Sequence, residues 1–492
     1  MRWLVLVVAA VGCGPATPPP LAPGPSSAPP PSGVEYVFAL DRALERMSVV
    51  VCFEGGRPDA MVPIHVDARE RIRHAEARVG TVSRPLPFER EIDLRGLPLE
   101  ACVAYEVDVA AGGRRGAAAG GSYRVGDDLV VPTSLWLWAP DRLRSDARIR
   151  ARFELPPGVR ASTVWPELSG DQGWLRLDTQ AFRYLAYVAF GTFEVERVAV
   201  PGGCIEVAVL DGELDTDAAA RARWLGAAGR AVSQLGGRFP AERAGVLVLP
   251  VPLADTPVLF GIVGRGMLPT IALLVGEDAE EDALVADWTA VHELTHLASP
   301  YVQRDEAWLT EGLATYYQQV LRARAELIPA ELAWTELVNG LARGRGEGTG
   351  RTLAEETRDM RSTHAYGRVY WAGAAIALLA DVELRRAGSS LDDAMRRAFE
   401  RRGETMTAAE LVRAMDGEDG GVLARLMERW IGSSELPEVG PTLEWLGVRA
   451  GPRGVTLDPD APGASVREAI VNDRREVASE PSTCEPRTSP RG

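Results

Sequence analysis

The apolar positions along the chain change their spacing about midway. Between residues 34 and 213 they come in short runs of strand type, separated by clusters of Gly, Pro and Asp. The runs at 47–53, 101–109 and 184–190 are examples. Such runs at turn-like intervals are typical of all-β domains. The pattern predicts a β-rich N-terminal region, 34–213, made of one or two β-sandwich units.

Helical spacing begins after this region. Apolar residues three or four apart at 216–236 predict a helix, and 244–251 and 264–275 predict strands. The apolar stretch from Asp282 to the residue before Pro300 predicts one continuous, buried helix. Together these elements predict an α/β domain over 214–325. The last strand is expected to run beside the apolar helix, where an exposed sheet edge can pair with an extended peptide.

From 326 to about 448 the spacing stays helical and predicts a helical C-terminal domain. Ser390 and Thr407 each precede an acidic residue three positions later and resemble helix N-caps. Residues 449–492 contain charge, Pro and Ser, and they predict a tail that is loose in part. The expected fold class is therefore multidomain α+β.

The first residues resemble an export signal. Arg2 precedes a short apolar run, and A-V-G-C at 10–13 resembles a bacterial lipobox. We expect 1–13 to be a lipoprotein-type signal peptide with Cys13 lipidated, and the Pro-rich stretch 14–33 to be a tether. The alternative is ordinary secretory cleavage with Cys13 as a spare thiol. The expected location is the bacterial cell envelope, with membrane contact only through the lipid on Cys13.

Charge and cysteines narrow the picture further. The formal net charge of −15 argues against nucleic acid as a partner. Four cysteines remain beyond Cys13, an even number that suits disulfides in an exported chain. Cys52 and Cys102 form the more natural pair because both lie in strand-like runs of one region, which leaves Cys204 with Cys484. Four unpaired thiols remain an alternative.

The strongest chemical signal is H-E-L-T-H at 292–296, within the apolar helix. Residues four apart share one helix face, so His292 and His296 point the same way and can bind one metal ion. Glu293 lies about 100° round the helix, beside the metal, where a general base must stand. The alternative is two core or cap histidines. The chain has five histidines, so a chance match is rare, and buried unpartnered His and Glu would be costly.

A catalytic zinc ion needs a third protein ligand and an open fourth position. Glu311 fits this role because it is acidic, lies on the next predicted helix and precedes Gly312, which leaves room. Thr315 lies one turn further on the same face and is a candidate to orient a ligand. The alternative for Glu311 is an ordinary first-turn glutamate favoured by the helix dipole. We expect one Zn²⁺ per chain.

These residues resemble those of the gluzincin metallopeptidases. W-L-T-E-G-L-A-T-Y at 308–316 is similar to the W-L-x-E-G-x-A-x-Y segment of the aminopeptidase N family. The stretches at 369–379 and 390–396 are similar to the Y-x-K-G-A and S-L-D-D-x-M-R stretches of bacterial glycyl aminopeptidases. The resemblance implies a thermolysin-like catalytic domain between a β-rich and a helical domain. It also implies that His292, His296 and Glu311 are ligands, Glu293 the general base and Tyr370 the oxyanion donor.

Several features depart from these families. Fourteen residues separate His296 from Glu311, fewer than in aminopeptidase N, and the predicted strand 264–275 lacks the glutamate that grips a free α-amine. Position 372 is Ala where the related motif has Lys, and no PDZ-like domain follows. The expected function is a zinc-dependent peptidase, aminopeptidase-like, in which Glu293 activates a zinc-bound water to hydrolyse a peptide or protein substrate. An endopeptidase of the same type and a non-catalytic zinc-containing surface lipoprotein are the alternatives.

Overall fold

The computed structural model describes residues 28–110, 121–163, 165–168, 173–183, 186–254, 256–265, 269–417, 421–481 and 484. The predicted signal peptide, Cys13 and most of the predicted tether lie outside these residues. Within them, no helix combines the length and the apolar character needed to cross a membrane.

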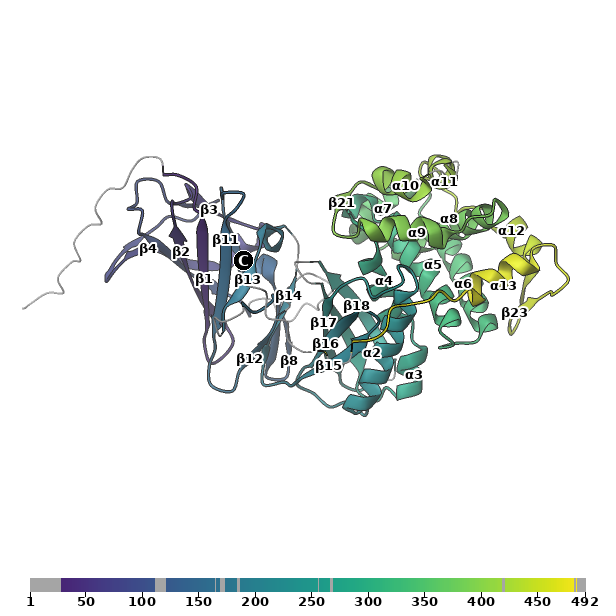
Figure 1. The fold of residues 1–492 in the computed structure, drawn as a ribbon, viewed down its shortest axis with the longest axis horizontal. Coiled ribbons are helices and arrows are strands. Elements are labelled where there is room, and N and C mark those ends of the chain that lie inside the picture. Colours follow the sequence, from purple (N-terminus) through teal and green to yellow (C-terminus); the bar gives the residue numbers. More distant parts are fainter. Residues whose placement is uncertain are drawn as a thin grey trace, which may run out of the picture.

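The N-terminal half is built from three packed β-sheets (Figure 1, purple to blue). The largest has the strand order β13-β11-β1-β2-β7-β4-β5 and contains β1 (Gly33–Leu40), β2 (Arg46–Glu54), β4 (Ile72–Val79), β5 (Val82–Pro85), β7 (Cys102–Asp108), β11 (Arg148–Glu154) and β13 (Leu175–Leu177). A small sheet joins β10 (Trp138–Pro140), β3 (Ala60–Pro63) and β6 (Ile92–Asp93). The third sheet joins β12 (Arg160–Ser162), β14 (Tyr187–Gly191), β9 (Asp128–Pro132) and β8 (Tyr123–Val125). The short helix α1 (Asp67–Arg71) precedes β4.

A core of alternating strand residues joins these sheets. Phe38 of β1 packs edge-on against Trp136, with ring centroids 4.8 Å apart, and Phe153 stacks on Trp165 at 6.0 Å. Phe190 of β14 belongs to the same buried cluster. The inward face of each strand is therefore apolar, as sheet-on-sheet packing requires. This confirms the predicted β-sandwich region. The disulfide between Cys52 and Cys102 joins neighbouring strands β2 and β7, which is the predicted first pair.

The second half is built on another sheet, with the order β15-β16-β17-β19-β18 (Figure 1, teal). Its strands are β15 (Val195–Val200), β16 (Gly203–Val209), β17 (Arg243–Val251), β18 (Val258–Gly264) and β19 (Thr270–Gly276), and α2 (Ala218–Ser233) connects β16 to β17. The predicted boundary at residue 213 falls inside this unit, because β16 pairs in parallel with β17. The sequence of the run 195–209 does not indicate which sheet its strands join, since strand patterns look alike in both halves of the chain.

The sandwich packs directly on this second sheet. Tyr187 and Ala189 of β14 share a buried cluster with Leu247 and Leu249 of β17. Asp128 at the start of β9 is buried and accepts bonds from the backbone N–H groups of Thr192 (3.0 Å) and Asp211 (2.8 Å). The interface is thus both apolar and hydrogen-bonded, and it fixes the sandwich against the sheet that carries the site.

The helices form the other side of the second half (Figure 1, green). They are α3 (Glu281–Ala286), α4 (Thr289–Thr295), α5 (Trp308–Arg324), α6 (Ala330–Gly346), α7 (Leu353–Thr363), α8 (Tyr366–Arg386), α9 (Leu391–Glu400), α10 (Ala408–Asp416), α11 (Val422–Trp430) and α12 (Gly440–Trp445). The short strands β20 (Tyr301–Val302) and β21 (Thr405–Met406) pair in parallel. The side chains of Ser390 and Thr407 cap α9 and α10, as predicted. One continuous hydrophobic core runs from β15 to α13, so α/β and helical parts are not separately packed.

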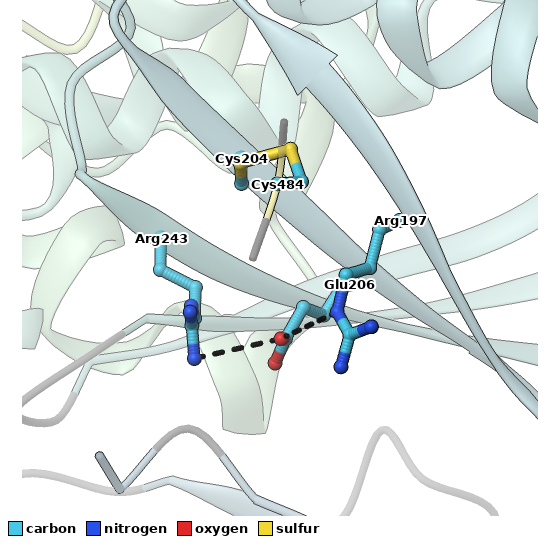
Figure 2. The surroundings of a disulfide bond; sticks show 5 residues. All are labelled: Arg197, Cys204, Glu206, Arg243 and Cys484. Atoms are coloured by element: carbon cyan, nitrogen blue, oxygen red, sulfur yellow. Dashed lines mark hydrogen bonds and ion pairs between the residues drawn. A yellow bond between two sulfur atoms is a disulfide. The ribbon is translucent and has the colours of Figure 1, made fainter. Parts of the chain in front are cut away.

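The segment predicted as a tail contains regular structure. β22 (Val448–Gly451) and β23 (Gly454–Leu457) form a hairpin, and α13 (Ala464–Asn472) packs against α5. The chain then runs back across α2 (Figure 1, yellow), where Ala478 donates its N–H to the Gly237 carbonyl at 2.7 Å. Cys484, the last residue that the structure describes, is bonded to Cys204 of β16 (Figure 2). We call residues 473–484 the C-terminal strap. This pairing matches the second predicted disulfide.

Candidate metal centre

The H-E-x-x-H segment lies on α4, which is shorter than predicted. The apolar stretch is broken at Asp287, whose extended backbone ends α3 and whose carboxylate accepts the Thr289 N–H at 2.7 Å. The prediction of one continuous helix is therefore wrong: Asp287 stops one helix and caps the next. His292 lies inside α4, and His296 begins a 3₁₀ turn directly after it. All residues of α4 are buried, as expected.

Three predicted ligands meet at one point. The Nε2 atoms of His292 and His296 each lie 3.4 Å from Oε2 of Glu311, which is brought in by α5. Tetrahedral zinc with ligands at about 2.0–2.1 Å places neighbouring ligand atoms about 3.3–3.4 Å apart. Two imidazoles and one carboxylate are also a donor set that zinc prefers. The residues present therefore fit a zinc ion of the catalytic type, which takes three protein ligands.

The electrostatics of the three side chains agree with this arrangement. Burial alone would raise the pKa of Glu311, but the two imidazoles outweigh burial and hold this pKa far below its ordinary value. Burial also lowers the pKa of His292, while Glu311 and Glu293 raise it more strongly, so that the pKa of His292 lies above its ordinary value. The carboxylate is thus kept ionised, which is the form that binds a metal cation.

The residue that orients His292 is Gln318, which the sequence reading missed. Its Oε1 lies 2.7 Å from His292 Nδ1, so that Nδ1 donates and Nε2 faces the metal position. Thr315, the predicted orienting residue, has a buried hydroxyl with no hydrogen-bond partner among the described residues. Thr315 and Gln318 lie on the same face of α5 as Glu311, about one and two turns after it. Only the longer amide side chain reaches the imidazole.

Arg265 binds the backbone of the turn that carries the other histidine, His296. Arg265, just after β18, donates to the backbone carbonyls of His296 and Ser299, the latter at 2.8 Å. These carbonyls end the helical turn and would otherwise lack helical partners. A cation there also complements the partial negative charge of the helix end. Arg265 therefore helps to hold the turn that carries His296.

Glu293 stands beside the ligands, as predicted. It lies against Gly261 of β18, where an added Cβ would come within 2.9 Å of Glu293 Oε1. Burial raises the pKa of Glu293, and the neighbouring His292 and His296 oppose that rise without cancelling it. A carboxylate with a raised pKa next to a metal position is suited to accept and return a proton.

Tyr370 approaches the same centre from α8. Its ring stacks on His292, with centroids 5.9 Å apart and an interplanar angle of 15°. Burial, together with the charges of Glu311 and Glu293 and the approach of its hydroxyl to the Glu311 carboxylate, raises the pKa of Tyr370 well above the ordinary value. Tyr370 therefore remains protonated and can donate a hydrogen bond, although its role in stabilising an oxyanion stays a prediction.

The sheet edge beside the site differs from the prediction. The predicted strand 264–275 matches β19, and only its first residue, Gly264, belongs to β18, which pairs antiparallel with β19. The last strand before the metal helix, β19, is internal, between β17 and β18. The edge is β18, which contacts α4. The sequence therefore predicted β19, but it did not predict the edge strand β18.

These features define a multidomain fold with a two-histidine, one-glutamate centre between an α/β sheet and a helical cap. No family model matches the chain, and no curated protein matches it in sequence. Solved structures do match it. One is an aminopeptidase N family protein from Idiomarina loihiensis, with a TM-score of 0.69 at 16% identity over 84% of this chain and 78% of that one.

A second match is an M1 zinc metallopeptidase from Deinococcus radiodurans. Its TM-score is 0.54 at 17% identity, over 85% of this chain and 96% of that one. A mutant of that protein bound to a Tyr-Ser-Ala substrate gives a TM-score of 0.54 at 16% identity, again over 85% and 96%. At such identities the likeness concerns the fold, which is that of the M1 zinc metallopeptidases. This confirms the fold that the gluzincin resemblance implied.

Proposed function

We propose that this protein is a zinc-dependent peptidase. The single observation that carries the proposal is the meeting of His292, His296 and Glu311 at tetrahedral spacing with Glu293 beside them. The shared fold supports it, since the matched structures are named as zinc metallopeptidases and one holds a peptide substrate. One zinc ion per chain is proposed, held by these two histidines and Glu311.

A zinc ion held there would supply Lewis acidity, which polarises a peptide carbonyl and acidifies a water molecule. Glu293 accepts the proton of the attacking water and passes it to the leaving amine. Tyr370 donates a hydrogen bond to the oxygen that gains charge as the carbonyl is attacked. The buried surroundings of both groups strengthen these interactions, because little water competes for them.

We propose aminopeptidase-like cleavage, with internal cleavage as the second candidate. The fold supports the first, since one match is named as an aminopeptidase N family protein. A specific observation favours the second: β18, the edge strand beside Glu293, carries neither Asp nor Glu to hold a free α-ammonium group. Peptides with free and acetylated N-termini separate the two, because an aminopeptidase cleaves only the former.

The test of the proposal combines metal analysis, a peptide-library digest and one matched pair of variants. Wild type is expected to hold about one zinc per chain and to cleave peptides. Glu293→Gln is expected to keep zinc and to lose turnover at least ~10²-fold, while Glu331→Gln, an exposed glutamate of α6, keeps both. Full activity of Glu293→Gln would contradict the proposed role of Glu293 as general base. Zinc binding without cleavage of any peptide would instead favour a non-catalytic surface lipoprotein.

We also propose that the protein is an envelope lipoprotein anchored through Cys13. The lipobox-like sequence at 10–13 supports this, and two disulfides suit an exported chain. Metabolic labelling with a fatty acid is expected to mark wild type and to spare Cys13→Ala. Labelling of Cys13→Ala at the wild-type level would contradict the anchor.

A further inference from the structure

A tyrosine of the sandwich reaches the neighbourhood of the metal centre. The N–H of Tyr187, on β14, donates to Thr270 Oγ1 at 3.1 Å, which ties it to the start of β19. Its side chain is buried, with 2% exposed. Within the described part of the chain, its hydroxyl has no hydrogen-bond partner. Such a hydroxyl is costly to leave unsatisfied, which points to a ligand or water that bonds it.

The charged groups around this hydroxyl identify the ligand's chemistry. Burial raises the pKa of Tyr187 to about 12, while the charges of Arg304 and Arg361 lower it and that of Glu293 raises it. The hydroxyl therefore lies within electrostatic range of both guanidinium groups and of the general base. Arg304 opens the short 3₁₀ turn 304–306 and Arg361 lies in the last turn of α7, and these two elements pack together.

Both arginines are exposed. Neither guanidinium group forms an ion pair or hydrogen bond with any residue that the structure describes. Arg322, Arg324 and Arg385, which are buried or partly buried in the same half, each bind a carboxylate of the protein itself. In a chain of net charge −15, these two guanidinium groups are left without a carboxylate partner among the described residues. Guanidinium groups match a carboxylate in shape and charge and can attract it from solution.

We propose that Arg304, Arg361 and Tyr187 form a binding site for a carboxylate of the peptide substrate. The inference rests on the proposed peptidase function and names its substrate class: peptides with a free carboxylate within a few residues of the scissile bond. The two arginines bind the carboxylate oxygens and the Tyr187 hydroxyl donates to one of them. The carboxylate is either the C-terminus of a short peptide or an acidic side chain.

The test uses one short peptide in three forms: free acid, C-terminal amide, and amide with a glutamate as the last residue. Each is titrated by calorimetry into zinc-loaded Glu293→Gln protein, which reports binding without turnover, and is also assayed with wild type. We expect the free acid to bind at least ~10-fold more tightly than the plain amide. If the acidic amide binds as tightly as the free acid, a side-chain carboxylate suffices. If it binds as weakly as the plain amide, the terminal carboxylate is required.

Variants in the same background locate the effect. Arg304→Gln with Arg361→Gln is expected to reduce the preference for the carboxylate to less than ~3-fold, and Tyr187→Phe to reduce it in part. Arg84→Gln removes one positive charge from β5, at the far edge of the sandwich, and is expected to leave the preference intact. Equal affinity of Glu293→Gln protein for all three forms overturns the inference, whatever wild type cleaves. An undiminished preference in a folded double variant overturns it as well. Tight binding of the acid with no cleavage by wild type overturns the peptidase function alone.

Discussion

Gly312 of α5 and Gly373 of α8 bring the backbones of two helices into contact. A Cβ added to Gly312 would lie 2.3 Å from Gly373 Cα, and one added to Gly373 would lie 2.6 Å from Gly312 Cα. Glu311 directly precedes the first glycine, and Tyr370 lies almost one turn before the second. The close approach of α5 and α8 therefore places Tyr370 within hydrogen-bonding reach of Glu311.

Gly312→Ala is predicted to damage both stability and activity. The methyl group has no space, so α8 must move away, at a cost of about 1–3 kcal/mol in the free energy of unfolding. The movement also withdraws Tyr370 from the metal centre. Thermal melting and kcat measure the two effects. Gly346→Ala, at the end of α6 with nothing within 4 Å of the added methyl, is the control and is expected to change neither. Wild-type melting and kcat in Gly312→Ala would refute the packing argument.

Gly261→Ala is predicted to separate metal binding from catalysis. The new methyl group on β18 would meet Glu293 Cγ at 2.7 Å, so the general base must shift. A misplacement of about 1 Å can cost about 10²-fold in rate. Zinc content is expected to stay near wild type because the three atoms nearest to the new methyl group belong to Glu293 and Thr289, which are not proposed ligands. Loss of zinc in this variant, or an unchanged kcat, would contradict the proposed placement of Glu293.

Gln318→Leu is predicted to weaken zinc binding about 10–100-fold, because His292 loses the acceptor that fixes its ring. Thr315→Val, one turn earlier on the same helix face, removes a hydroxyl that has no partner in the described structure. It is therefore expected to leave zinc affinity unchanged. Competition with a chromophoric chelator measures both affinities. A larger loss of zinc affinity in Thr315→Val than in Gln318→Leu would indicate that Thr315, not Gln318, orients His292.

The sequence identified the three candidate metal ligands because their geometry is mostly local. His292 and His296 share a helical face through spacing alone, and Glu311 needs only that the next helix fold back. Gln318 depends on how α5 crosses α4, a tertiary angle that spacing does not define. The sequence did contain one indication of this role. Gln318 lies seven residues after Glu311, and that interval returns to the same face of a helix.

Strand and helix limits were harder to predict than the chemistry. Asp287 breaks the apolar helix although the hydrophobic pattern continues across it. β19 was predicted because it is an almost fully buried apolar run, whereas β18, a partly exposed edge strand without regular alternation, was not predicted. The hairpin and α13 were hidden in a polar segment, because their burial comes from packing on α5 and α6 rather than from their own composition.

The disulfide between Cys204 and Cys484 is predicted to hold the C-terminal strap in place. It links residues 280 apart, whereas Cys52 and Cys102 are 50 apart. In the loop-entropy account the longer closure stabilises more, by roughly 1.5 kcal/mol. Replacing both Cys204 and Cys484 by Ser is therefore expected to lower Tm more than replacing Cys52 and Cys102. It is also expected to expose residues 473–484 to a protease.

Two measurements check this prediction. Calorimetric scans of both double variants compare the losses of stability, and limited proteolysis followed by mass spectrometry locates the first cut. The hydrogen bond from Ala478 to Gly237 and the ion pair of Arg230 with Glu480 also hold the strap. The ion pair is exposed and contributes about 0–1 kcal/mol at most, so these contacts alone are not expected to protect the strap. A variant without the Cys204–Cys484 bond that melts like wild type and resists cleavage before residue 484 would show that non-covalent packing suffices.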